Sequence, residues 1–247
     1  MKSETIDTIL GGALTVVQPR NGYRFSIDSI LLGRFVRARQ RDRVLELGAG
    51  CGVVSVMIAA LWNPREVVAL EIQPELAAIA ARNAVLNHLD SIRVVNADLR
   101  ARRIDGLIPA SFDLVIANPP YRALRTGRTS PNPERRIARD ESAATLAEFI
   151  KAAKRYAANG ARVAFVFKAS RSAELLRCLA ENTLEPKRIR FVHPRADAPA
   201  ATMLVEARKG GGIEAAIEPP LIIYDHPGVY SDEARDLMQN VSRQRGG

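Results

Sequence analysis

The segment that most constrains the fold runs from Arg43 to Leu61 and carries three glycines at alternate positions. Its first five residues are mostly apolar and predict a buried strand, and the apolar run Val53 to Leu61 predicts a helix. Glycines between a strand and a helix allow the backbone to approach a ligand closely at the helix N-terminus. This order of elements is typical of an α/β sheet whose ligand lies beyond the carboxyl ends of the strands.

The glycine turn differs from the dinucleotide-binding fingerprint, in which a glycine or alanine stands at the sixth position. Counting from Gly48, the sixth position is Val53, and a glycine, Gly52, stands at the fifth. Glu46 lies just before the first glycine and suits a ligand that carries a cation rather than a pyrophosphate. The pattern E-L-G-x-G-x-G, which contains Glu46, Gly48, Gly50 and Gly52, therefore indicates a ligand site more specifically than a glycine turn alone.

Polar residues also end the next three predicted strands. Glu71, Asp98 and Asn118 each follow a short apolar run. Glu71 stands where a ribose diol is usually held, a feature that NAD and S-adenosylmethionine enzymes share. Because the carboxyl ends of parallel strands meet at one edge, polar residues at four consecutive strand ends predict a ligand cleft along that edge.

The fourth strand, Phe112 to Ala117, ends at Asn118-Pro119-Pro120-Tyr121. Pro120 has no N–H and holds Pro119 extended, which leaves the Pro119 carbonyl free to accept a hydrogen bond. The Asn118 side-chain carbonyl is a second acceptor, and Tyr121 offers an aromatic face for stacking. These residue types suit the binding of a planar amino group. A Pro-Pro turn with a capping Asn and a buried Tyr is the structural alternative.

The chain before the glycine turn predicts a short strand or hairpin over residues 5–19, followed by a helix. Ser26 or Asp28 is suited to cap this helix, whose apolar face extends to Phe35. One interpretation is a helix that only packs against the core. The other is a lid in which Tyr23, Phe25 and Asp28 cover a ligand at the glycine turn.

These motifs resemble those of the class I S-adenosylmethionine-dependent methyltransferases, in the branch that methylates planar amino groups. The resemblance rests on Glu46 to Gly52, Glu71, Asp98 and Asn118 to Tyr121. The segments Asn21 to Asp28, Tyr121-Arg122 and Leu221 to Ser231 narrow it to the bacterial tRNA(Val) adenine methyltransferases. Those enzymes modify the exocyclic amine of the adenosine beside the anticodon. The similarity extends from about residue 8 to residue 240.

The resemblance implies a Rossmann-like seven-stranded sheet with helices on both faces and an antiparallel C-terminal strand pair. It implies one methyltransferase domain over residues 1–247, with a lid segment 1–40, a core 41–209 and a C-terminal extension 210–247. The implied cofactor is S-adenosyl-L-methionine. Its expected binding residues are Tyr23, Asp28, Glu46, Gly48, Gly50, Gly52, Glu71, Asp98 and Asn118.

The expected catalytic residues are Asn118, Pro119 and Tyr121. If the two N–H bonds of an adenine amine point at the Asn118 and Pro119 carbonyls, the nitrogen lone pair is directed toward the methyl donor without a strong base. We expect Tyr121 to stack on a base that has swung out of its loop.

An arginine-rich segment follows the tetrapeptide. Residues 122–140 show neither strand nor helix periodicity, and a loop this long is usually functional or disordered. We interpret it as a clamp on the phosphates of an RNA substrate, with a solvated loop that binds nothing as the alternative. The expected RNA-binding residues are Arg122, Arg125, Arg128, Arg135 and Arg136.

The composition narrows the possible partners. The net charge of +9 favours a polyanion such as tRNA or another RNA. Cys51, Cys178 and three isolated histidines form no ligand pattern, so no metal is expected. No apolar run approaches the length of a membrane span and the N-terminus lacks a signal pattern, which predicts a cytoplasmic protein without a membrane partner. The oligomeric state stays open.

Three functions are compatible with these motifs. Methylation of an adenine amino group in RNA, above all in tRNA near the anticodon, is favoured. A protein glutamine methyltransferase is the second, because a side-chain amide is also planar, but such enzymes usually carry a longer N-terminal domain than residues 1–42 provide. A non-catalytic nucleic-acid-binding protein on this scaffold is the third, and the intact motifs argue against it. DNA methylation is disfavoured because no large target-recognition domain is present.

Overall fold

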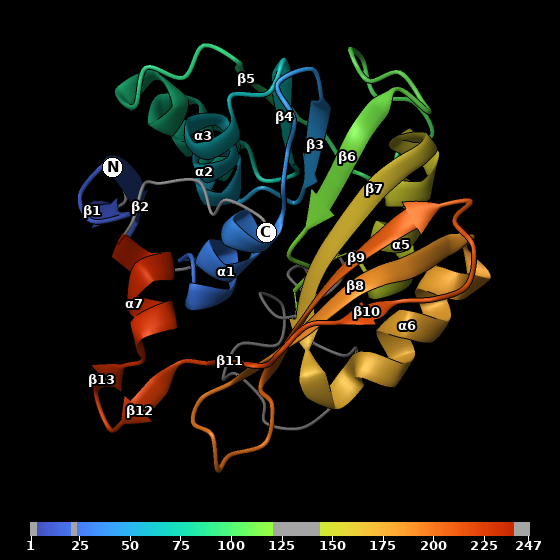
Figure 1. The fold of residues 1–247 in the computed structure, drawn as a ribbon. Helices are drawn as coiled ribbons and strands as arrows, with labels where there is room; N and C mark the ends of the chain where they lie inside the picture. Colours follow the sequence, from blue (N-terminus) through green and yellow to red (C-terminus); the bar gives the residue numbers. More distant parts are fainter. Residues whose placement is uncertain (1–3, 21–23, 121–143, 240–247) are drawn as a thin grey trace, which may run out of the picture.

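The computed structural model describes residues 4–20, 24–120 and 144–239. A β-hairpin precedes the main fold. Its strands β1 (Glu4–Ile9) and β2 (Leu14–Pro19) pair antiparallel, with Ile9 opposite Leu14 (Figure 1). This hairpin confirms the one predicted over residues 5–19.

Five parallel strands form the centre of the main sheet, in the spatial order β5-β4-β3-β6-β7. They are β3 (Arg43–Leu47), β4 (Glu66–Glu71), β5 (Ile92–Asn96), β6 (Phe112–Ala117) and β7 (Ala157–Lys168). Strand β3 pairs with both β4 and β6, so the strand order reverses beside it. In open α/β sheets the ligand binds at such a reversal, beyond the carboxyl ends of the strands.

An antiparallel pair completes the seven strands that the sequence predicted. Strand β9 (Thr202–Lys209) pairs antiparallel with β7, and β8 (Leu184–His193) pairs antiparallel with β9. The C-terminal segment then adds β10 (Ala216–Ile217) and β11 (Leu221–Ile222) in parallel to β8, so the sheet has nine strands within the described residues. A short ribbon of β12 (Tyr224–His226) and β13 (Val229–Tyr230) follows.

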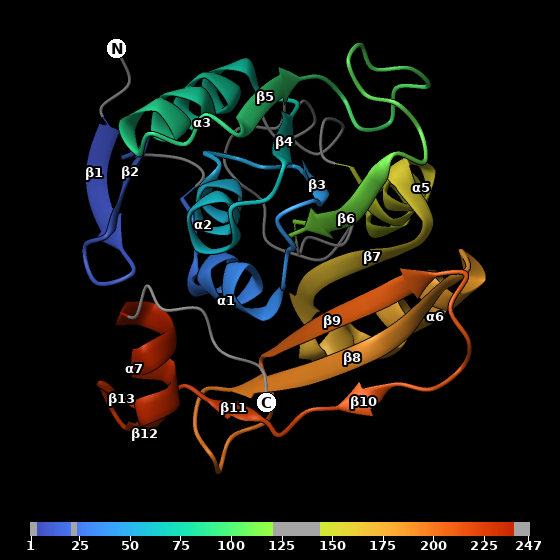
Figure 2. The same ribbon diagram turned by 45° about the horizontal axis from the view of Figure 1, so that its top comes forward.

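Helices cover both faces of the sheet (Figure 2). On one face lie α5 (Leu146–Tyr156) and α6 (Ser172–Glu181), preceded by a 3₁₀ turn over Ala169–Arg171. On the other lie α1 (Ile27–Phe35), α2 (Val53–Trp62) and α7 (Asp232–Gln239). Helix α3 (Pro74–Leu86) packs against α2 and the hairpin. The α/β fold with helices on both faces is therefore confirmed.

Asn83 on α3 and Asn87, the C-cap residue of that helix, hold the hairpin in place. The Asn83 side chain accepts from the Val17 N–H at 2.8 Å and donates to the Val17 carbonyl at 2.9 Å. Asn87, one helical turn further on, does the same with Thr15 at 2.9 and 2.7 Å. Each side-chain amide therefore substitutes for a neighbouring strand, which satisfies the free edge of β2.

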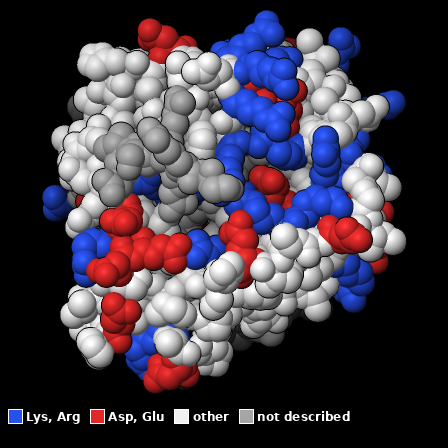
Figure 3. All heavy atoms as spheres, in the orientation of Figure 1, with Lys and Arg blue, Asp and Glu red and all other residues white. Residues whose placement is uncertain are grey.

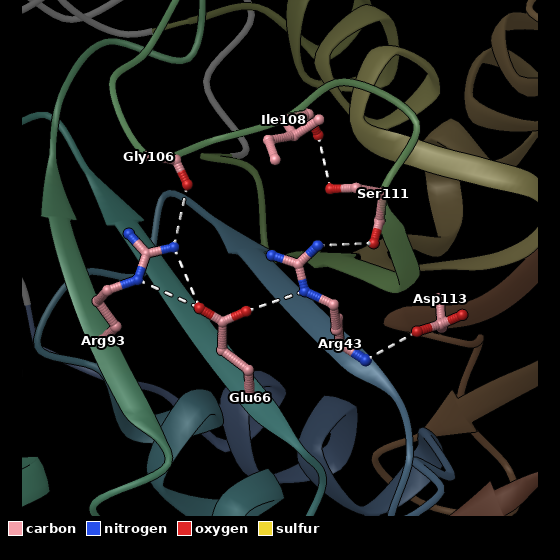
Figure 4. A network of polar contacts seen from close by, with 7 residues as sticks. All are labelled: Arg43, Glu66, Arg93, Gly106, Ile108, Ser111 and Asp113. Carbon is pink, nitrogen blue, oxygen red and sulfur yellow. Dashed lines mark hydrogen bonds and ion pairs between the residues drawn. The ribbon is translucent and has the colours of Figure 1, made fainter.

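An ion-pair network ties together three strands at the amino-end edge of the sheet (Figure 4). Glu66 on β4 accepts from Arg43 on β3 at 3.0 Å and from Arg93 on β5 at 3.1 Å. Arg93 also donates to the Gly106 carbonyl at 3.1 Å, and the Arg43 N–H donates to Asp113 at 2.8 Å. Although burial raises the pKa of the Glu66 carboxyl, its hydrogen bonds to the two guanidinium groups hold that pKa below the ordinary value.

We expect Glu66→Gln to lower the free energy of unfolding by about 1 kcal/mol at pH 7, because a partly exposed ion pair contributes modestly. The lowered pKa means that the contribution is complete above the ordinary carboxyl pKa and is lost as the pH falls through the lowered value. Urea unfolding at pH 7 and below pH 4 measures both effects. The matched control is Glu181→Gln, at an exposed position on α6. Equal stability of the two variants at pH 7 would contradict the prediction.

Candidate active site

A narrow pocket lies at the carboxyl end of β3, between the glycine turn, α1 and the end of β6. Glu46, Gly48 and Asn118 meet there, although they come from two different strands of the sheet. The sequence predicted that these three residues share one edge, and the structure confirms this. The complete lining is Phe25, Ser29, Glu46, Gly48, Ala49, Cys51, Val53, Val54 and Asn118.

The three glycines adopt a backbone that other residues avoid. Gly48, Gly50 and Gly52 have φ angles of 69°, 58° and 80°, all in the left-handed region. Packing adds a second reason at two of these positions. A Cβ on Gly48 would lie 3.1 Å from the ring of Phe149 on α5, and one on Gly52 would lie 2.9 Å from the Cβ of Ala80 on α3. Both the turn and the approach of two helices therefore require glycine.

Glu46 is a buried acid on the wall of the pocket, with 2% of its surface exposed. Its Oε2 accepts from the Ser55 N–H at 2.9 Å and from the Ser55 hydroxyl at the start of α2. Burial raises the pKa of the Glu46 carboxyl to about 7, against the opposing effect of the two hydrogen bonds from Ser55, and the nearby Glu71 raises it further. A cation in the pocket would stabilise the ionised carboxylate.

Glu71, at the end of β4, shapes the glycine turn. Its Oε2 accepts from the Gly50 N–H at 2.8 Å, and its Oε1 accepts from the Gln73 N–H at 2.9 Å. Each carboxylate oxygen has a second lone pair, so these bonds leave acceptor capacity for a ligand hydroxyl. The predicted role of Glu71 as a ribose ligand stays a prediction.

Asp98 follows β5, at the same edge of the sheet. Its two carboxylate oxygens accept from the side chain of its neighbour Arg100, Oδ1 at 3.0 Å and Oδ2 at 2.7 Å, and Oδ1 also accepts from the Arg100 N–H at 2.8 Å. The hydrogen bonds from the Arg100 side chain hold the pKa of Asp98 below its usual range. Asp98 is therefore ionised at the carboxyl edge, and its role in cofactor binding stays a prediction.

Asn118 directly follows β6 and is half-buried. Its Nδ2 donates to the hydroxyl of Ser29 on α1 at 3.3 Å. This bond fixes the orientation of the amide, because the amide nitrogen faces α1 and the side-chain oxygen faces the other way. The next residue, Pro119, is buried. The roles of the Asn118 and Pro119 carbonyls as acceptors stay predictions.

Phe25, just before α1, and Ser29 on that helix line the pocket, whereas the predicted lid residue Asp28 points elsewhere. Asp28 accepts from the Thr202 hydroxyl at the start of β9, at 3.1 Å, and it does not line the pocket. Ser26 is the N-cap residue of α1, but its side chain makes no capping hydrogen bond. The lid interpretation therefore rests on Phe25 more than on Asp28.

Sequence reasoning missed Ser29. The only available signal was a polar residue on a helix that is otherwise apolar on one face, next to the Ser-Ile-Asp segment. It also missed Asn83, which is fully buried on α3 and donates to the Cys51 carbonyl in the glycine turn at 2.8 Å. Both residues act across elements that are distant in sequence.

Several predicted site residues lie outside the described residues, and their predicted roles stay predictions. They are Tyr23, Tyr121, Arg122, Arg125, Arg128, Arg135 and Arg136.

Two findings in the described ranges bear on metal binding and thiol chemistry. Within residues 4–20, 24–120 and 144–239, no group of three His, Cys, Asp or Glu could hold a metal ion. Burial raises the pKa of the Cys51 thiol to about 12, so this pocket residue stays protonated and does not act as a nucleophile.

None of the helices in these ranges has the length and apolar character needed to cross a membrane.

A family model confirms the class of protein that the fold and pocket indicate. The methyltransferase small domain model matches residues 24–185, which include the glycine turn and Asn118. The chain therefore belongs to the methyltransferase small domain family. The resemblance to S-adenosylmethionine-dependent methyltransferases that the motifs indicated is confirmed.

Named relatives and solved structures agree with this family. A protein of Aeromonas hydrophila named tRNA1(Val) (adenine(37)-N6)-methyltransferase is 26% identical over 216 residues, covering 86% of this chain and 87% of the relative. The crystal structure of a predicted O-methyltransferase from Agrobacterium tumefaciens is 25% identical with a TM-score of 0.68, covering 85% and 94% of the two chains. TYW2 of M. jannaschii, solved in complex with AdoMet, shares the fold at 16% identity with a TM-score of 0.54, covering 84% and 86%.

We expect Ser29→Ala to lower the rate of methyl transfer about tenfold, because the Asn118 amide loses the hydrogen bond that orients it. Cofactor affinity and the melting temperature should change little. Single-turnover transfer and calorimetric titration of the cofactor measure these quantities. Ser26→Ala on the same helix is the control, since that side chain makes no capping hydrogen bond. An unchanged rate in the Ser29 variant would show that Ser29 does not position Asn118.

Proposed function

We propose that this methyltransferase transfers a methyl group from S-adenosyl-L-methionine to the exocyclic amino group of an adenine in tRNA, beside the anticodon. The observation that carries the proposal is the position of Asn118, with its amide oriented by Ser29, beside a pocket formed by the glycine turn. The relatives of this chain that are named tRNA1(Val) (adenine(37)-N6)-methyltransferase support the choice of adenine and of tRNA. Such an enzyme would work in the cytoplasm.

The residues present fit this cofactor. A buried carboxyl whose pKa is raised to about 7 is relieved by a positive charge, and Glu46 provides such a group on the pocket wall. The glycine turn also lies at this pocket, at the N-terminal end of α2. Because glycine has no side chain, a ligand there can come close to the backbone of the turn. When bound, S-adenosylmethionine supplies a methyl group on a positively charged sulfur.

Each residue of the site would then have a separate task. Glu46 offsets the charge of the cofactor, and the backbone at Gly48 and Gly50 contacts it. Glu71 holds the turn and accepts from the ribose hydroxyls, and Asp98 binds at the adenosine end of the same edge. These assignments follow the positions of the residues along the carboxyl ends of β3, β4 and β5.

The target amine would be held by two carbonyl groups. Its N–H bonds donate to the Asn118 side-chain oxygen and the Pro119 carbonyl, which turns the nitrogen lone pair away from the base and toward the pocket. Fixed acceptors also stabilise the positive charge that develops on this nitrogen, so no strong base is needed. Stacking by Tyr121 and phosphate binding by Arg122, Arg125, Arg128, Arg135 and Arg136 complete the proposal.

The favoured substrate is tested with labelled S-adenosylmethionine and three acceptors: unmodified tRNA, DNA and a nucleic-acid-free protein extract. We expect label in tRNA, recovered as N6-methyladenosine. Asn118→Ala should lower this transfer at least about a thousandfold while cofactor affinity stays within a few fold, because the amine loses one of its two acceptors whereas the cofactor keeps its contacts with the glycine turn, Glu71 and Asp98. Label in protein would instead identify a glutamine methyltransferase. Wild-type rates in the variant would refute the role of Asn118.

The affinity for S-adenosylmethionine should rise several-fold between about pH 6 and pH 8. Since the pKa of Glu46 is raised to about 7, its carboxyl is mostly protonated at the lower pH and ionised at the higher. A cation binds the ionised form better, so affinity follows ionisation. Calorimetric titration across this range is the measurement. Glu46→Gln keeps an acceptor for Ser55 and should remove the rise that ionisation of the carboxyl causes, and an identical profile in the variant would contradict this.

A further inference from the structure

Basic side chains gather at the amino-end edge of the sheet, opposite the edge that carries the pocket. Figure 3 shows a cluster of Lys and Arg at the top of the molecule, over the starts of the strands in the view of Figure 1. Residues 39–43, 65–66, 93 and 102–113 of this region contain seven arginines and four acidic residues, so positive charge is in excess.

Part of this charge has a structural task and part does not. Arg43 and Arg93 bind Glu66, and Asp42 binds Arg162. By contrast, five exposed arginines have no hydrogen bond or ion pair from their guanidinium groups to any residue of the described chain. They are Arg39, Arg41, Arg65, Arg102 and Arg103. Their charge is therefore available to a partner.

The segment between β5 and β6 connects this surface with the pocket edge. It begins at Asp98 and Arg100, beside the carboxyl end of β5, and by Gly106 it has reached Arg93 at the other edge. Arg102 and Arg103 lie between these two points in the chain. Strand β6 has 6 residues, so the two edges are about 20 Å apart at roughly 3.3 Å per residue. The segment that carries Arg102 and Arg103 therefore runs from the active-site edge to the opposite edge, where Arg41 and Arg65 lie just before β3 and β4. We call these four arginines the strip.

We propose that this strip, Arg41, Arg65, Arg102 and Arg103, binds the phosphate backbone of the RNA stem next to the methylated loop. This inference rests on the proposed function, because it takes tRNA as the substrate. With the target base at Asn118, the helical part of the RNA extends away from the pocket edge, and the segment 97–111 offers it a basic path.

The chemistry of the strip suits double-stranded RNA. Guanidinium groups bind phosphates through paired N–H donors, and several separate guanidinium groups suit a series of phosphates rather than one small anion. RNA helices are bound mainly through backbone and shape, because their deep major groove excludes side chains. Such contacts strengthen binding without selecting sequence.

The test compares two triple variants with the same change in charge. The first replaces Arg65, Arg102 and Arg103 by Gln. The control replaces Arg82, Arg177 and Arg235 by Gln, which are exposed on α3, α6 and α7. Each variant is measured with two RNAs: full-length tRNA, and the isolated anticodon loop closed by a few base pairs. For both RNAs the affinity is measured over a series of salt concentrations, and the rate is measured by single-turnover methyl transfer.

For the first variant we expect at least tenfold weaker binding of full-length tRNA. The slope of the logarithm of the binding constant against the logarithm of the salt concentration should fall in magnitude by about two to three, since each phosphate contact contributes about 0.9 to this slope. The rate at saturating RNA and the affinity for the short loop should stay at wild-type values. The control variant should lose much less affinity for tRNA.

Three results would overturn the proposal. An equal loss of tRNA affinity in the control variant would show that the effect comes from net charge alone. An equal loss of affinity for the short loop would place the contacts at the active site. Unchanged tRNA binding would show that the strip does not touch RNA. Failure of the proposed function would look different, because the wild-type protein would then bind tRNA without transferring methyl to either RNA.

Discussion

The site depends on hydrogen bonds between the glycine turn after β3 and the carboxyl end of β4. The N–H groups of Gly48 and Ala49 both donate to the Leu70 carbonyl, at 2.8 and 3.0 Å, and the Gly50 N–H donates to Glu71. Left unsatisfied in a buried turn, each N–H would cost about 1–3 kcal/mol. Since β3 and β4 are neighbours with Leu47 opposite Leu70, the sheet register alone brings these groups together.

Other elements hold this turn from further sides. Asn83 on α3 binds the Cys51 carbonyl while it also binds β2, and Glu46 on β3 binds the start of α2 through Ser55. The turn is thus fixed by a strand, two helices and the hairpin before any ligand arrives. A site held in this way binds its ligand without the cost of ordering a loop.

The sequence was informative where a local pattern determines the structure. Strand ends such as Glu71 and Asn118 were predictable because apolar runs mark buried strands and because parallel strands share one carboxyl edge. The two short strands β10 and β11 were not predicted, because two-residue segments carry no periodicity. The roles of Ser29 and Asn83 were not predicted for another reason: their hydrogen-bond partners lie far away in the chain. The same holds for Asp28, whose contact with Thr202 no local pattern indicates.

The placement of charge follows from opposite demands of the two ligands. A cationic cofactor is favoured near an acidic wall, whereas an RNA backbone requires positive charge. An arginine in the pocket would pair with Glu46 and oppose the cation, and no Lys or Arg is present among the pocket-lining residues of the described chain. The arginines of the strip lie instead along the segment 97–111 and at the amino-end edge. Under the proposed function, the distance between the acidic pocket wall and the arginines of the strip would allow the protein to bind a cation and a polyanion at the same time.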